Sequence, residues 1–151
     1  GLTDLSPLVV SEEQPLGRVG RLASPLSLGD FAARVASALP TAPVGIRVSG
    51  PAEATVETVA VLGGSGDDLF GAVRASGADA YITADLRHHP ALEAREEARD
   101  GTPYLIDAGH WASEAVWLPR AAKVLREALG DRVEVVVSEI VTDPWTFVVH
   151  P

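Results

Sequence analysis

His110 and Glu114 are four residues apart at the start of a predicted helix, so their side chains share one face of it. An imidazole and a carboxylate at this spacing suit Zn²⁺, Mn²⁺ or Fe²⁺. The alternative is a first-turn glutamate favoured by the helix dipole beside a surface histidine. Two ligands do not complete a metal site, so at least one more must come from elsewhere.

Asp85 and His89 form a second candidate group. Asp85 lies shortly before the pair His88-His89, and His89 is the second residue of that pair. Adjacent histidines point apart in an extended backbone, so at most one of them faces a common site. In the functional interpretation, Asp85 and His89 orient metal ligands or act as acid and base. An equally good interpretation of Asp85 is that it caps the following helix.

The run Gly63-Gly64-Ser65-Gly66 lies between a predicted strand and a predicted helix. Backbone N–H groups there, with the helix dipole, could cradle a phosphate or a carboxylate, which makes Gly63, Gly64 and Ser65 candidate ligand-binding residues. The run lacks the Lys-Ser/Thr ending of a P-loop and the spacing of a dinucleotide fingerprint. A tight turn explains these glycines equally well.

After residue 51, predicted strands and helices alternate at regular intervals, and these elements must position the candidate residues. Predicted strands begin at intervals of roughly 22 residues, the length of a strand, a helix and two loops in a right-handed crossover. The strands are expected at 59–62, 80–83, 104–107 and 133–141, and the helices at about 67–76, 90–101 and 110–129, the last kinked at Pro119. This pattern predicts an α/β fold with a mostly parallel sheet flanked by helices. Ligands bind at the carboxyl ends of such strands, where the candidate residues gather.

Residues 1–50 predict a less regular entry of strand, helix and strand. Ser27 is a natural N-cap, and Leu28, Phe31 and Val35 fall on one face of a helix after it. We therefore expect residues 1–151 to form a single α/β domain, with regular βα units over 51–151.

The amino-acid composition excludes several classes of function. Twelve Lys and Arg against 21 Asp and Glu leave no basic footprint for nucleic acid. The absence of Cys excludes disulfides, thiolate metal sites and a cysteine nucleophile. No apolar run approaches a membrane span and no signal peptide is visible, so we expect a cytoplasmic protein without membrane partners. The first residue is not Met, which suggests that the chain is part of something longer.

Three segments, 59–66, 77–85 and 106–114, resemble in this order the Nif-three-like dinuclear-metal family, also called type 2 homologues of GTP cyclohydrolase I. Residues 17–22 and 142–146 resemble its actinobacterial members. The resemblance covers nearly the whole chain, but only the C-terminal half of a family member.

The resemblance implies two similar α/β lobes with a two-metal site between them, and toroidal hexamers. It makes His110 and Glu114 metal ligands, with Glu114 able to bridge both ions, and places Asp85 and His89 in the same cleft. The family's adjacent His-His pair and its acidic ligand belong to the other lobe, so this chain would supply half of a site for two divalent ions. Ala84 departs from the glycine usual before this aspartate.

Three functions are compatible with these features. The first is a metal-dependent hydrolase acting on a nucleotide or another phosphorylated small molecule, with the glycine run receiving phosphate. The second is a non-enzymatic, metal-binding, hexameric assembly protein. The third is a small ligand-binding module without metal.

Overall fold

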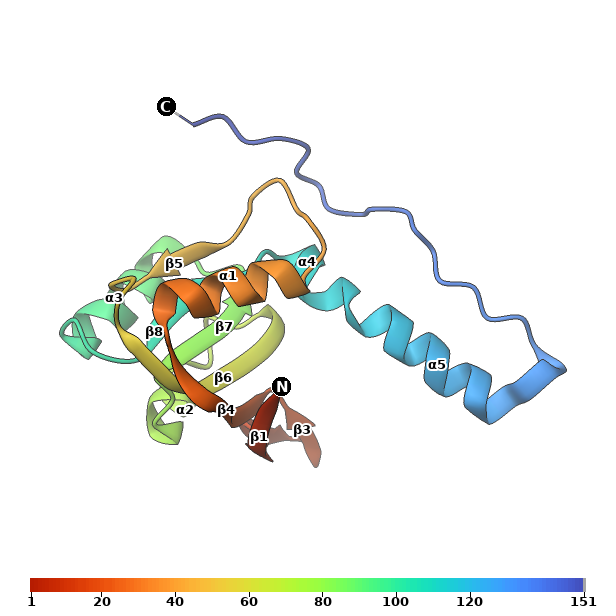
Figure 1. Cartoon of the computed structure of the whole chain (residues 1–151), viewed down its shortest axis with the longest axis horizontal. Coiled ribbons are helices and arrows are strands. Elements are labelled where there is room, and N and C mark those ends of the chain that lie inside the picture. The colour runs from red at the N-terminus through yellow and green to blue at the C-terminus, as the bar shows by residue number, and fades with distance from the viewer. Residues whose placement is uncertain (151) are drawn as a thin grey trace.

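The computed structural model describes residues 1–150 and contains a central six-stranded sheet (Figure 1). The strand order is β1 (Leu2–Ser6), β4 (Arg18–Ser27), β6 (Thr55–Ser65), β7 (Ala80–Ala84), β8 (Tyr104–Asp107) and β5 (Arg47–Ser49). A short hairpin of β2 (Val9–Ser11) and β3 (Gln14–Leu16) lies between β1 and β4 in the sequence.

The sheet is mixed rather than purely parallel. Strands β6, β7 and β8 are parallel to one another, as the crossover spacing predicted. Strands β1, β4 and β5 join it in antiparallel pairings. The α/β prediction is therefore confirmed. The first 50 residues add antiparallel strands at both edges, β1 and β4 at one and β5 at the other. These pairings are long-range and leave no local signal in the sequence.

Helices cover both faces of the sheet. Helix α1 (Leu28–Ala38) begins where predicted, because the Ser27 side chain accepts a hydrogen bond from the Asp30 N–H. Its apolar side packs on one face, against Val59 and Ile106. Helices α2 (Phe70–Ser76) and α3 (His88–Ala98) cover the other face, where Ala60 and Tyr81 are buried. Neighbouring strand residues thus point to opposite cores, which holds the central strands between two layers.

All three helices predicted after residue 51 differ in their limits, and α3 covers residues 88–98 rather than about 90–101. Strand β6 continues through Ser65, so α2 begins at Phe70 rather than at residue 67. The stretch 110–129 divides into α4 (His110–Ala115) and α5 (Trp117–Leu129), and the break lies one turn before Pro119. Proline has no N–H to donate to the carbonyl four residues earlier, at Ala115, and its ring crowds that carbonyl. The helix therefore restarts with Pro119 in its first turn.

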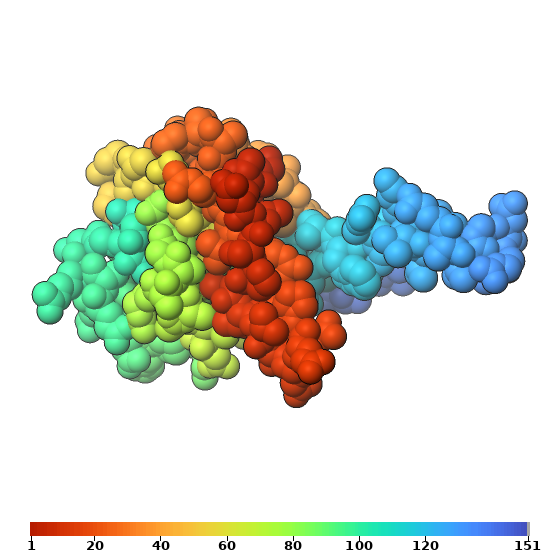
Figure 2. All heavy atoms as spheres, turned by 90° about the horizontal axis from the view of Figure 1, so that it is seen from below, coloured from red at the N-terminus to blue at the C-terminus, as the bar shows by residue number. Residues whose placement is uncertain are grey.

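The predicted final strand at 133–141 is wrong. After the short helix η1 (Gly130–Arg132), this segment is extended but pairs with no strand within residues 1–150. Helix α5 projects away from the sheet (Figures 1 and 2). The tail after it runs back in the direction of the sheet without joining it (Figure 1). A run of β-branched residues becomes a strand only where a neighbouring edge pairs with its backbone. No helix among the described residues is long and apolar enough to span a membrane.

Candidate metal centre

The carboxyl ends of the three parallel strands bring the candidate residues together. Strand β6 ends with Gly64 and Ser65, β7 is followed by Asp85, and β8 leads through Gly109 into α4. Asp85 and Gly109 both have left-handed backbones, with φ of 54° and 74°. One of these turns is therefore at a site residue, Asp85, and the other is at the residue directly before His110.

His110 lies between two carboxylates. Its Nδ1 is 2.7 Å from Asp85 Oδ2, and its Nε2 is 3.2 Å from Glu114 Oε2. An ionised carboxylate only accepts, so Nδ1–H donates to Asp85. This bond fixes the ring and leaves Nε2 directed toward Glu114, which is how an outer carboxylate orients a metal-binding imidazole. Asp85 and His110 are thus neighbours in space, although 25 residues separate them in the chain.

The electrostatics follow from the same contacts. The hydrogen bond to Asp85 is the main cause that raises the pKa of His110 above its ordinary value, and the negative charge of Glu114 adds to it. All three side chains are about half exposed, at 46% for His110, 52% for Asp85 and 55% for Glu114. A cation can therefore reach them from solvent.

Strand β6 and helix α4 approach each other very closely at this site. A β-carbon on Gly63 would lie 3.2 Å from the Ser113 carbonyl oxygen. The Gly64 N–H donates to Ser113 Oγ at 2.9 Å, and Thr83 Oγ1 donates to the Gly64 carbonyl at 3.0 Å. The glycines thus let the strand lie against the helix that carries both candidate ligands.

The structure places other predicted residues differently. His89 lies on α3, where its ring contacts that of His88, and no hydrogen bond or ion pair among residues 1–150 joins it to His110. The Gly64 N–H, which an anion would need, is already taken by Ser113. A catalytic role for His89 and an anion cradle at Gly63, Gly64 and Ser65 stay predictions.

Sequence reasoning did not assign a role to Asp107, the last residue of β8. Its buried carboxylate pairs with Arg47 and accepts hydrogen bonds from the Leu86 and Gly109 N–H groups, each at 3.3 Å. A charged residue that ends an apolar strand is the signal that could have identified it, since a buried carboxylate needs partners.

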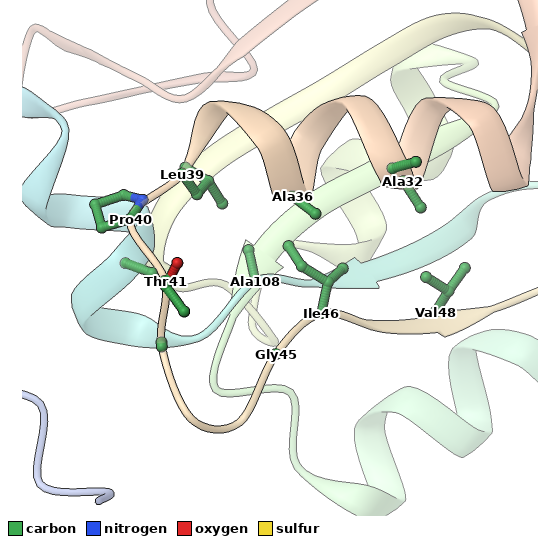
Figure 3. A pocket seen from close by; sticks show the side chains of 12 residues that line it. Ala32, Ala36, Leu39, Pro40, Thr41, Gly45, Ile46, Val48 and Ala108 are labelled. Carbon is green, nitrogen blue, oxygen red and sulfur yellow. The ribbon is translucent and has the colours of Figure 1, made fainter. Parts of the chain in front are cut away.

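A cavity of about 760 Å³ opens beside the cluster. Besides His110 and Glu114, its lining includes Arg47, Trp111 and Trp145. A second cavity, of about 450 Å³, lies beneath α1 between Ala36, Ile46 and Ala108 (Figure 3). The described residues that line this second cavity include no ionisable side chain.

The donor set fits part of a metal site. The imidazole Nε2 and the Glu114 carboxylate are ordinary ligands of Zn²⁺ and similar ions, and Asp85 occupies the other ring nitrogen. Gly64 leaves the space beside them open, because a β-carbon there would lie 2.5 Å from Glu114 Oε1. Within residues 1–150, no three His, Cys, Asp or Glu side chains are grouped to hold an ion. His110 and Glu114 are therefore two candidate ligands, fewer than a complete site needs.

Comparison with curated proteins gives the relatives of this chain. A Streptomyces coelicolor protein named GTP cyclohydrolase 1 type 2 homolog is 50% identical over 158 residues, covering 97% of this chain and 54% of that protein. A Mycobacterium tuberculosis protein of the same name is 48% identical over 130 residues, covering 86% of this chain and 34% of that protein. The chain thus spans about half the length, or less, of these relatives.

Solved structures agree with these relatives. A Bacillus cereus protein related to NIF3 superposes with a TM-score of 0.76 at 32% identity, covering 88% of this chain and 35% of that one. Staphylococcus aureus protein SA1388 gives a TM-score of 0.74 at 29% identity, covering 87% and 42%. The family model for Duf34/NIF3 (NGG1p interacting factor 3) matches residues 1–144. The chain therefore belongs to the DUF34/NIF3 family, which confirms the resemblance seen in its sequence.

Proposed function

We propose that this chain supplies two ligands, His110 and Glu114, to a divalent metal centre at the carboxyl edge of its sheet. The observation that carries the proposal is the line of contacts from Asp85 through the His110 ring to Glu114. An imidazole held at Nδ1 by a carboxylate presents Nε2 in a fixed direction, and a second carboxylate stands next to that nitrogen. The remaining ligands, and a second ion, would come from a region that corresponds to the part of the relatives that this chain does not cover.

We further propose that the whole protein is a metal-dependent hydrolase of a nucleotide or another phosphorylated small molecule. The shared name of the relatives, GTP cyclohydrolase 1 type 2 homolog, supports this class of reaction. A divalent cation supplies Lewis acidity to such a reaction. The chain's own residues would orient His110 through Asp85 and hold the substrate in the adjoining cavity, which Arg47, Trp111 and Trp145 help to line.

The metal proposal is tested by titrating the longer protein, which would hold the remaining ligands, with Zn²⁺ in a calorimeter, and Mn²⁺ and Fe²⁺ can be compared in the same way. Saturable binding of Zn²⁺ that is lost in His110→Ala is expected. His88→Ala is the matched control, because it removes a histidine at the start of α3 that lies outside the site. Equal Zn²⁺ binding by the native chain and His110→Ala would overturn the ligand assignment.

A non-enzymatic, metal-binding hexameric assembly protein is the second candidate. It is favoured by the exposed apolar side chains of α5 and the tail, among them Trp117, Val136 and Phe147 at 64%, 77% and 76% exposure. The two candidates separate in the longer protein, assayed for release of phosphate or base from GTP. A hydrolase loses that activity in Glu114→Gln, whereas an assembly protein shows none before or after the change.

A further inference from the structure

Asp107 holds the two turns on which the candidate metal centre depends. Its Oδ2 accepts a hydrogen bond from the Leu86 N–H, and its Oδ1 accepts one from the Gly109 N–H, both at 3.3 Å. Leu86 directly follows Asp85, and Gly109 directly precedes His110. A single carboxylate therefore contacts the neighbour of each member of the Asp85–His110 pair.

Both turns need such contacts. Asp85 has a φ of 54°, which is uncommon for a residue other than glycine and persists only where surrounding contacts maintain it. Gly109 has a φ of 74°, a conformation that is open to glycine but only one of many it can adopt. The Asp107 carboxylate links the two turns directly, in addition to the backbone hydrogen bond from the Ala108 N–H to the Thr83 carbonyl at 2.8 Å.

Arg47 holds Asp107 in turn. The two residues face each other across the antiparallel pair of β5 and β8, and the Arg47 guanidinium forms an ion pair with Asp107 Oδ2. The Asp107 side chain is only 8% exposed, so this charge partner offsets much of the cost of burying a carboxylate. The Arg47 side chain is 69% exposed, so it can be changed without opening the core.

We infer that the Arg47–Asp107 pair is a positioning device that sets the tautomer and direction of the His110 ring. With both turns held, Asp85 stays at Nδ1 and Nε2 faces the metal position. The inference rests on the proposed metal function, but its effect on the His110 ring exists in the metal-free chain. Neither residue is a ligand in this scheme. Both act through Asp85 and His110.

The test is Asp107→Asn, an isosteric change. An amide keeps only one acceptor oxygen. That oxygen can accept either from Arg47 and Leu86 or from Gly109, and the NH₂ group then faces the donor that has lost its acceptor. The ¹⁵N signals of the His110 ring are recorded at a pH where the ring is neutral, and the Zn²⁺ affinity of the longer protein is measured by calorimetry. We expect the native ring to carry its proton on Nδ1, the variant to shift toward Nε2, and Zn²⁺ affinity to fall about 10- to 100-fold.

Asp79→Asn is the matched control. Asp79 accepts backbone hydrogen bonds from Glu57 and Thr58, at the opposite end of β7 from the site. It should leave the His110 ring signals and Zn²⁺ affinity unchanged.

If Asp107→Asn does not fold, Arg47→Met takes its place and should shift the same ring signals by a smaller amount. A folded variant of the pair with native ring signals would overturn the inference, and so would a native chain with the proton on Nε2. Absence of Zn²⁺ binding by the longer protein, together with a shifted ring in Asp107→Asn, would instead refute the metal function and leave the positioning role standing.

Discussion

Gly64 lies so close to Glu114 that a β-carbon on residue 64 would meet Glu114 Oε1 at 2.5 Å. That distance is shorter than real β-carbon contacts, so any side chain at this position must displace the carboxylate. Gly64 also has a φ of 71°, a left-handed conformation that other residues adopt at a cost. The glycine thus serves both the backbone turn and the space that the Glu114 side chain occupies.

Gly64→Ala is therefore expected to weaken Zn²⁺ binding and to lower the free energy of unfolding by about 1–3 kcal/mol. Calorimetric titration measures the first effect and urea unfolding the second. Gly77→Ala is the control, since Gly77 ends α2 with a φ of 70° and nothing lies within 4 Å of its β-carbon position. It should show the backbone cost without the metal effect. Equal Zn²⁺ affinity in the two variants would contradict the closeness of Gly64 to the ligand.

Glu114→Gln tests the carboxylate itself. Glutamine has the same shape but no charge, so it is a poor ligand for a divalent cation. Zn²⁺ affinity should fall by more than the roughly 10- to 100-fold that loss of an outer hydrogen-bond partner causes. Glu93→Gln, on α3, changes the net charge equally and serves as the control. Unchanged Zn²⁺ affinity in Glu114→Gln would remove Glu114 from the ligand set.

The sequence allowed the central part of the fold to be predicted because its signals are local. The Ser27 cap and the apolar spacing after it predict α1, and the apolar runs predict β7 and β8. The pairing of β5 with β8 brings together residues nearly 60 apart in the chain, and β5 is a three-residue strand. No local sequence pattern predicts such a pairing.

In the candidate site, too, local contacts could be predicted from the sequence and long-range contacts could not. Helical spacing alone predicts that His110 and Glu114 share a face, because it depends on residues within one turn. The contact between Asp85 and His110 depends on two parallel strands ending at the same edge, and its hydrogen bond depends on a left-handed turn at Asp85. The sequence could place these residues at one edge but could not give the atoms that meet. His89 shows the limit, since it is near Asp85 in the chain but lies on α3.

The ion pair between Asp67 and Arg87 makes stability depend on pH. The hydrogen bond from Arg87 is the main cause that holds the pKa of Asp67 below its ordinary value. A lowered pKa in the folded state stabilises the protein above the ordinary pKa of aspartate, and this contribution is lost as the pH falls through the folded-state pKa. Asp67→Asn should therefore lower Tm by roughly 2–4 °C at pH 7 and have no effect in strong acid.

Thermal unfolding followed by circular dichroism between pH 7 and pH 2 measures this difference. Asp68→Asn is the control, because the Asp68 side chain is 92% exposed and its carboxylate is 3.7 Å from Arg87. Its Tm should stay close to the native value throughout. A Tm difference for Asp67→Asn that grows as the pH falls would have the wrong sign and refute the assignment.

Tyr81 links strand β7 to the loop that follows β6. It is fully buried, and its hydroxyl donates to the Gly66 carbonyl at 3.0 Å, just beyond the end of β6. Tyr81→Phe leaves that carbonyl without this partner, so the free energy of unfolding should fall by about 1–2 kcal/mol in urea denaturation. Tyr104→Phe is the comparison, because the Tyr104 hydroxyl makes no hydrogen bond within residues 1–150 and its ring is partly exposed. If both variants lose equal stability, the loss belongs to the hydroxyl group in general and not to the bond with Gly66.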